Sequence, residues 1–148
     1  MKRPLSQRPE AKRQRGAIMP KRVLRERTRY WEKPPNARSV SRETRYGNPF
    51  KILPPIRGLT RTWRVIWVHE GAGLDRVPPA GFKPSRCQTE HQAYELAVWL
   101  FREWITAPER VDLLEAFRYE LAGLDLMCWC RLDLPCHVDV LLDLVNRP

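Results

Sequence analysis

Leu124–Asn146 reads LDLMCWCRLDLPCHVDVLLDLVN, and three of the chain's four cysteines and one of its three histidines fall within ten residues of it. An apolar run over 124–130 is typical of a short buried strand. Polar residues and a proline follow at 131–135. Beyond them, apolar side chains recur at helical spacing at Val138, Leu141, Leu142 and Val145. The stretch therefore predicts a strand, a tight loop and a helix.

The sulfur and imidazole side chains of this stretch are expected to meet across the loop. Because strand side chains alternate, Cys128 and Cys130 share one face. Cys136 and His137 begin the helix, where free N–H groups and the helix dipole favour negative charge. Thiolate and imidazole are ligands that zinc prefers, so these four residues form a candidate zinc site. Its spacing departs from the usual zinc patterns, and adjacent ligands at 136 and 137 normally point apart.

Two other interpretations of the cluster remain open. A cysteine at a helix N-terminus beside an imidazole has thiolate character, which makes Cys136 and His137 a candidate catalytic pair. The same helix N-terminus would suit a phosphate group. Alternatively, Cys128 and Cys130 fill a buried strand as small apolar residues, and His137 only caps the helix. Cys87 stands apart in the sequence and is expected to serve packing or to lie at the surface.

A second motif, the Arg42–Phe50 turn (RETRYGNPF), predicts a fixed and exposed turn. Gly47 and Asn48 tolerate positive φ, and Pro49 holds the residue before it away from helix. An asparagine amide flanked by arginines can bind an anionic ligand. The candidate ligand-binding residues are therefore Arg42, Gly47, Asn48 and Pro49. The alternative is that the motif is simply a stable turn.

The remaining elements predict the fold class. A short strand is expected near 38–42, and β-branched and aromatic residues predict a second at 63–69. Capping-type sequences at Thr89 and Thr106 predict two helices, the second ending at Gly123. The order is strand, strand, helix, helix, strand, helix.

A helical connection between two strands usually pairs them in parallel, so the strands at 63–69 and 124–130 are expected to pair. This predicts an α/β fold with a small, mostly parallel sheet and flanking helices. Ligands of such sheets bind beyond the carboxyl ends of the strands, where the loop at 130–137 would lie.

The positive charge is concentrated at the start of the chain. Residues 1–33 carry twelve Lys and Arg against three Glu, a net charge of +9, whereas residues 34–148 carry fifteen against fourteen, a net charge of +1. The sequence therefore predicts a disordered, flexible basic arm at 1–33 and a single α/β domain at 34–148. The arm's candidate nucleic-acid contacts are Lys12, Arg13, Arg15, Lys21 and Arg22. No segment is apolar enough to predict a membrane span or a signal peptide, so a cytoplasmic protein is expected, with the thiols reduced.

Both ends of the chain resemble a family of small proteins from bacteriophages and actinobacteria that is known only as a domain of unknown function. The resemblance covers about 19–53 and 94–145, and rests on MPKRVLRERTRYWEKPPN, on GNPF and on LAGLDLMCWCRLDLPCHVDVLLDLVN. The matching positions are Arg27, Arg42, Gly47, Asn48, Pro49, Phe50, Cys128, Cys130, Cys136, His137 and Asp139. Two departures are Ser41, where the family commonly has glycine, and a proline-rich segment at 54–88 that is longer than expected. The resemblance implies that the GNPF turn and the Cys-His turn form one site.

The terminal strand, Cys-His turn and helix are also similar to those of a second uncharacterised bacterial family. In that family an arginine follows the histidine, whereas this chain has Val138. An anion-binding role of that arginine therefore does not carry over. Neither resemblance implies a reaction.

The leading functional prediction is a phage-type protein that binds or acts on a nucleotide or nucleic-acid-derived ligand. Its pocket is predicted to be formed by Arg42, Asn48, Cys136 and His137. The alternative prediction is a zinc-stabilised nucleic-acid-binding module, in which the cysteine cluster is structural and the basic arm binds. A phage-encoded chain would act in the host cytoplasm.

Overall fold

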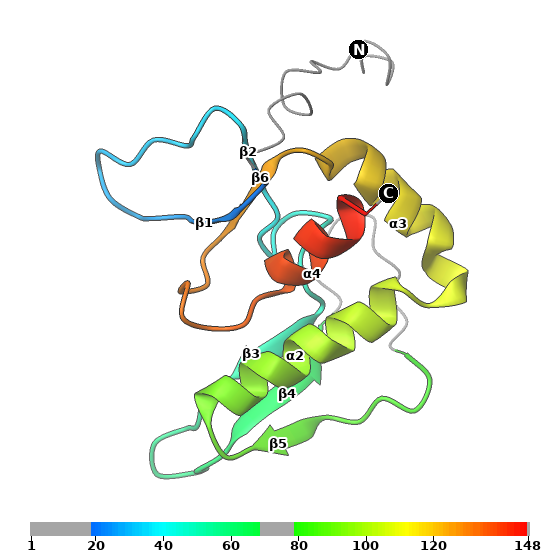
Figure 1. The fold of residues 1–148 in the computed structure, drawn as a ribbon. Helices are drawn as coiled ribbons and strands as arrows, with labels where there is room; N and C mark the ends of the chain where they lie inside the picture. Colours follow the sequence, from blue (N-terminus) through cyan, green and yellow to red (C-terminus); the bar gives the residue numbers. More distant parts are fainter. Residues whose placement is uncertain (1–18, 69–78, 148) are drawn as a thin grey trace.

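The computed structural model describes residues 19–68 and 79–147, which form two small sheets and three α-helices (Figure 1). One sheet is parallel and the other is antiparallel, and each has three strands. This confirms the predicted α/β class. The single mostly parallel sheet is replaced by two separate sheets.

The parallel sheet has the strand order β1-β6-β2, so the last strand in the sequence is the central one. Its strands are β1 (Arg22–Leu24), β6 (Asp125–Cys128) and β2 (Ala37–Ser39). The register places Arg22 opposite Leu126 and Ala37 opposite Asp125. β1 lies within the segment expected to be a flexible arm, and this expectation is wrong for residues 22–24. They are ordered because β6 offers an apolar edge with free hydrogen-bonding groups.

The antiparallel sheet has the order β3-β4-β5. It contains β3 (Phe50–Leu53), β4 (Trp63–Trp67) and β5 (Ser85–Cys87). The expected parallel pairing of the strand at 63–69 with the strand at 124–130 is therefore wrong. The connection from β3 to β4 passes through Gly58, whose φ of 82° suits a reversing turn, so β4 pairs with its sequence neighbour instead. The end of the predicted strand, from residue 69, lies outside the described residues.

The three helices are α2 (Glu90–Ile105), α3 (Val111–Leu121) and α4 (His137–Val145). The capping box at Thr89 is confirmed, since its hydroxyl accepts from the Gln92 amide and the Gln92 side chain accepts from the Thr89 amide. Thr106 is the C-cap of α2 and does not start the next helix. A 3-10 turn, η2 (Pro108–Arg110), lies between Thr106 and the start of α3. No helix among the described residues has the length and apolarity that a membrane span requires.

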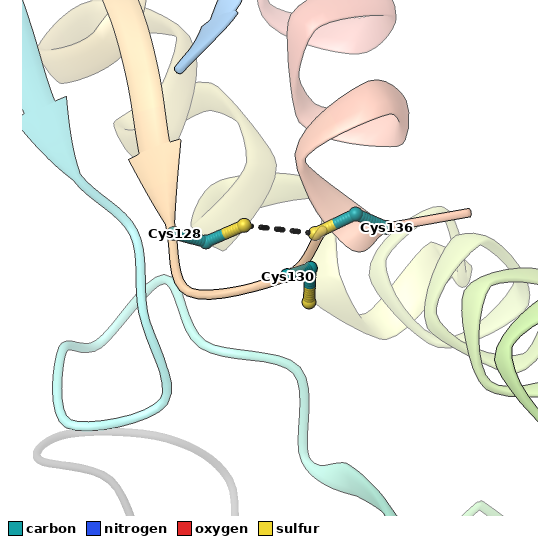
Figure 2. A group of neighbouring side chains, drawn as sticks. All are labelled: Cys128, Cys130 and Cys136. Carbon is teal, nitrogen blue, oxygen red and sulfur yellow. Dashed lines mark hydrogen bonds between the residues drawn. The ribbon is translucent and has the colours of Figure 1, made fainter. Parts of the chain in front are cut away.

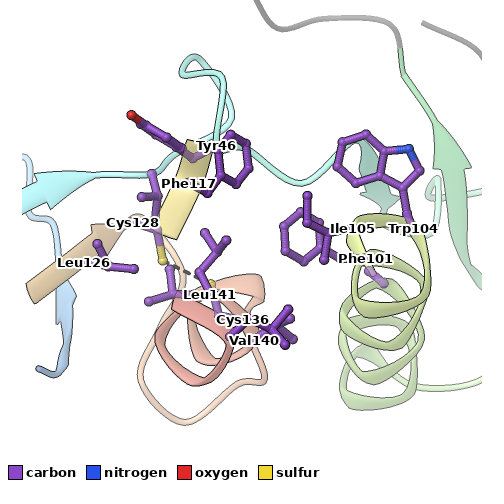
Figure 3. Packing of buried hydrophobic residues seen from close by; sticks show 14 of the residues in the cluster. Tyr46, Phe101, Trp104, Ile105, Phe117, Leu126, Cys128, Cys136, Val140 and Leu141 are labelled. Carbon is purple, nitrogen blue, oxygen red and sulfur yellow. Dashed lines mark hydrogen bonds between the residues drawn. The ribbon is translucent and has the colours of Figure 1, made fainter. Parts of the chain in front are cut away.

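The core joins the two sheets through the helices (Figures 1 and 3). α2 packs on β3 and β4 on one side and on α4 on the other, while α4 also packs on α3 and β6. Fully buried side chains run from the parallel sheet across α4 to α2: Leu126, Leu141, Val138, Phe101, Ile105 and Trp104. The start of α4 is therefore fixed between β6 and α2, which positions the cysteine cluster.

Candidate metal centre and adjoining pocket

The three clustered cysteines lie on three successive pieces of local structure (Figure 2). Cys128 ends β6, Cys130 lies in the bend that follows, and Cys136 is the N-cap of α4. Their sulfur atoms all lie within 4.8 Å of one another, and the Sγ atoms of Cys128 and Cys136 are 3.2 Å apart. All three thiols are free. The strand is shorter than predicted, so Cys130 reaches the cluster from a bend rather than from the strand face.

Arg22 of β1 fixes the loop that brings Cys136 back to Cys128. Its guanidinium donates to the carbonyl oxygens of Arg131 at 3.1 Å and Leu132 at 2.7 Å, and forms a 2.9 Å ion pair with Asp139 on the first turn of α4. The Arg22 side chain is only 10% exposed. Because these contacts bind both sides of the loop, β1 is part of the cluster's scaffold.

His137 is buried, and its two ring nitrogens have different surroundings. Nε2 donates to the Val40 carbonyl oxygen at 2.8 Å, and since a carbonyl only accepts, Nε2 carries the proton. Burial lowers the imidazole pKa, so the ring is neutral and Nδ1 has a free lone pair. Nδ1 lies 3.6 Å from the Cys136 sulfur. His137 thus contacts the edge of the cluster, whereas the group of ligand atoms that all lie within 4.8 Å of one another in the described part of the chain consists of the three cysteine sulfurs.

The three thiols do not ionise equally. Hydrogen bonds from the Cys128 and Cys136 thiols lower the pKa of Cys130 to about 3, with Arg22 and Arg42 adding favourable charge. The hydrogen bond with Cys130 and burial raise the pKa of Cys128, although its hydrogen bond with Cys136 acts in the opposite direction. Hydrogen bonds with both neighbours, and burial, raise the pKa of Cys136. Of the three thiols, Cys130 is therefore the one whose ionisation the surroundings favour. Ionisation is thus favoured at Cys130 rather than at the predicted Cys136, because hydrogen bonds with the Cys128 and Cys130 sulfurs, and further burial, raise the pKa of Cys136.

The cluster forms the floor of a pocket of about 290 Å³. The walls come from β3, from α2 and from the connecting segments that follow β2 and β6: Ser41, Arg42, Asn48, Phe50, Lys51, Ile52, Tyr94, Ala97, Val98, Trp129 and Pro135. Thus Arg42 and Asn48 of the GNPF turn and Cys136 and His137 of the Cys-His turn line one pocket. It lies beyond the carboxyl ends of β6 and β2, where ligands of parallel sheets bind.

The GNPF turn is buried rather than exposed as expected. Asn48 Oδ1 accepts from the Phe50 amide at 2.9 Å, and Nδ2 donates to the Ala97 carbonyl at 3.1 Å, so this side chain ties the turn to α2. Its backbone carbonyl accepts from Arg42 Nη1 at 2.8 Å. The amide therefore has one remaining N–H for a ligand. Pro49 is buried behind the turn, where its carbonyl accepts from the Val68 amide.

Gly47 is needed for space rather than for positive φ. The positive-φ residues in the described part of the chain are Gly58, Gly81 and Gly123. A Cβ on Gly47 would lie 2.6 Å from the Arg42 Cα and 2.9 Å from its carbonyl oxygen. This close approach of the two backbone segments places Arg42 next to the turn, where its guanidinium donates to the Asn48 carbonyl oxygen.

The predicted nucleic-acid contacts divide into two groups. Lys12, Arg13 and Arg15 lie outside the described residues. Lys21 is exposed, and its backbone amide donates to the Asp125 carboxylate at 3.0 Å. The Arg22 guanidinium binds the carbonyl oxygens of the loop and the Asp139 carboxylate.

A protein-family comparison matches residues 23–147 to the family described as "Domain of unknown function (DUF4326)". The chain belongs to this family. The match confirms the resemblance inferred from the two end motifs, and it spans the proline-rich segment between them. Neither a curated protein nor a solved structure matches the chain.

Three long polar or aromatic side chains that line the pocket of this DUF4326 chain were not predicted as site residues: Lys51, Tyr94 and Trp129. Lys51 lies on a strand that was not predicted, and Tyr94 lies on a helix whose pattern only marked its apolar face. Trp129 stands between two cysteines, and the guanidinium groups of Arg25 and Arg27 each lie 4.5 Å from its ring centroid. The position between Cys128 and Cys130 was the one available signal.

Proposed function

We propose that this protein binds a zinc ion through Cys128, Cys130 and Cys136, with His137 Nδ1 as the fourth ligand. The observation that carries the proposal is the convergence of the three cysteine sulfurs within 4.8 Å of one another. His137 Nδ1 lies 3.6 Å from the Cys136 sulfur but outside this group, so it must move toward the other two sulfurs to serve as the fourth ligand. Sulfur at about 2.3 Å and nitrogen at about 2.0 Å from zinc place tetrahedral ligands about 3.6–3.8 Å apart. The 3.6 Å separation of Cys136 Sγ and His137 Nδ1 already matches, and the Cys128–Cys136 pair must widen by about half an ångström.

The surroundings support a metal in two ways. A histidine ligand commonly donates its other N–H to a backbone carbonyl, which fixes the tautomer, and His137 does so to Val40. Three clustered thiolates would repel one another, and a divalent cation at their centre would offset that repulsion. The set of three soft sulfur ligands and one imidazole favours zinc over calcium or magnesium.

The test is the metal content of the purified full chain, measured by elemental mass spectrometry. We expect one zinc per chain, with Cys130→Ser losing most of it because the ligand is removed. Cys87→Ser is the matched control, since Cys87 lies on β5 away from the cluster, and it should keep its zinc. Far-ultraviolet circular dichroism of both variants reports whether they fold.

Cobalt substitution tests the coordination itself. Tetrahedral thiolate coordination gives intense visible bands and a sulfur-to-cobalt charge-transfer band, and His137→Gln should alter the bands without abolishing binding. A wild-type chain that takes up neither zinc nor cobalt would contradict the proposal. So would equal metal content in Cys130→Ser and Cys87→Ser.

A second function, binding of a small ligand, is favoured by the pocket that opens on the same cluster. Arg42 lines this pocket beside Asn48, Cys136 and His137. With zinc bound, Cys136 and His137 would be metal ligands, and the metal-bound cluster would form the floor of the pocket. This leaves the polar residues on the walls to recognise the ligand.

A further inference from the structure

The pocket walls present positive charge without compensating carboxylates. Among the described residues that line the pocket, Arg42 and Lys51 are cationic and none is Asp or Glu. Arg42 is already engaged within its own turn, since its guanidinium donates to the Asn48 carbonyl oxygen. Lys51 adds a second positive charge to the pocket wall.

Lys51 is half-buried on β3, and its ammonium has no hydrogen bond or ion pair to any residue the structure describes. A partly desolvated ammonium without an acceptor is unfavourable unless a ligand or water supplies one. The same holds for the hydroxyl of Tyr94, a half-buried residue of α2 with no hydrogen-bond partner in the described part of the chain. Both groups line the same pocket, so both donors are available to one ligand.

Apart from Ser41 and Asn48, the rest of the wall is largely apolar. Ile52, Val98 and Pro135 line the pocket, together with Trp129. Pockets for small molecules usually have volumes of about 300–1,000 Å³, so about 290 Å³ suits a ligand at the lower end of this range. A compact ligand would match this pocket if it had an anionic group to face Lys51 and Tyr94 and a flat apolar part to face the apolar wall.

We infer that the pocket binds a small phosphate-bearing molecule with a planar ring, of the size of a nucleoside monophosphate, whose phosphate is held by Lys51 and Tyr94. This deepens the ligand-binding function proposed above, and it does not require the metal. Lys51 supplies the charge and Tyr94 a neutral donor to the phosphate oxygens. The ring lies against the apolar wall at Trp129 and Pro135.

The test is isothermal titration of the full, metal-loaded chain with nucleoside monophosphates, with the corresponding nucleosides and with inorganic phosphate. We expect monophosphates to bind at least about tenfold more tightly than nucleosides, a difference of about 1.4 kcal/mol. Lys51→Met should weaken monophosphate binding at least tenfold, and Tyr94→Phe by a smaller factor. Binding should weaken as salt is raised, because the contact is between charges.

Two matched controls separate this contact from general effects. Lys83→Met removes the same charge from an exposed site outside the pocket, and Tyr30→Phe removes an exposed hydroxyl. Both should bind monophosphates like the wild type. The inference is overturned if no monophosphate binds, if nucleosides bind equally well, or if Lys51→Met matches Lys83→Met.

Metal analysis of the same samples distinguishes the two proposals. Lys51→Met and Tyr94→Phe should keep one zinc per chain, since neither residue is a ligand. Normal zinc content with unchanged monophosphate binding in Lys51→Met would refute the phosphate site and leave the metal centre standing. Monophosphate binding that depends on Lys51 in a chain without zinc would refute only the metal centre.

Discussion

Gly47 shows how one residue without a side chain shapes the pocket wall. Its Cα approaches the Arg42 backbone so closely that the turn from Ser41 to Asn48 folds back on itself. The fold brings the Arg42 guanidinium to the Asn48 carbonyl, and Asn48 in turn anchors the turn on α2. A cation thereby reaches the pocket from the GNPF turn, which itself is buried.

Gly47→Ala should therefore destabilise the protein. The added methyl group would meet backbone atoms, which cannot move aside like a flexible side chain, so we expect the free energy of unfolding to fall by about 1–3 kcal/mol. Urea unfolding measures this change. Gly58→Asn is the control, because position 58 has open space around it and asparagine tolerates positive φ. Equal stability of Gly47→Ala and the wild type would refute the steric argument.

β1 is short for an element that supports the site. Its three residues pair with β6, and Arg22 extends from it to the loop beyond β6. The planar guanidinium makes three contacts at once, to two carbonyl oxygens and to the Asp139 carboxylate. β1 therefore holds the cluster loop as well as the edge of the parallel sheet.

Arg22→Lys tests this role, since lysine keeps the charge but lacks the forked geometry. Hydrogen bonds to charged groups contribute about 1.5–3 kcal/mol, and we expect a loss of stability in this range. Hydrogen exchange of amides 129–136 should accelerate more than exchange elsewhere. Arg86→Lys, an exposed position on β5, should change neither quantity. Uniform acceleration across the chain would count against a local clamp.

At the scale of the whole molecule, the cluster links the parallel sheet to the helical layer. A metal bound there would connect the end of β6 to the start of α4. The helix α4 in turn packs on α2 and α3. A ligand that binds only the folded state stabilises it by about 4 kcal/mol at a thousand times its dissociation constant. Metal binding should therefore act on global stability.

Chelation should lower the melting temperature of the wild type by roughly 10 °C, given about 2–4 °C per kcal/mol in a chain of this size. Re-addition of zinc should restore it. Cys87→Ser should respond like the wild type, whereas Cys130→Ser should melt at the lower temperature with or without chelator. A melting temperature that is the same for wild type with and without chelator would show that the cluster holds no stabilising metal.

Elements with strong local patterns were predictable from the sequence. Thr89 and Gln92 mark the start of α2, Gly123 marks the end of α3, and the aromatic run near Trp63 marks β4. β1, β3 and β5 were not predicted, because strands of three or four residues are too short to show alternation. Their positions depend on distant partners such as the β1–β6 pair, which local patterns do not encode.

The candidate site was predictable only in part, because local sequence patterns show residues that are close in sequence but not contacts between distant ones. The cysteines and His137 are close in sequence, and the Cys-His turn identified them as a group. The orientation of Nδ1 depends on a contact with Val40, which is 97 residues away. Lys51 and Tyr94 reach the pocket from the other sheet and from α2, and no spacing rule connects them to the cysteines.

The central place of β6 bears on how the protein forms during synthesis. β1 and β2 are made first, but the strand that pairs with both follows about a hundred residues later, since Lys21 contacts Asp125 at a separation of 104. β3, β4 and β5 can pair as they emerge, because each neighbours the next in sequence. Long-range pairing is slow, so the antiparallel sheet is expected to assemble before the parallel one. Metal acquisition would then be the closing step of maturation.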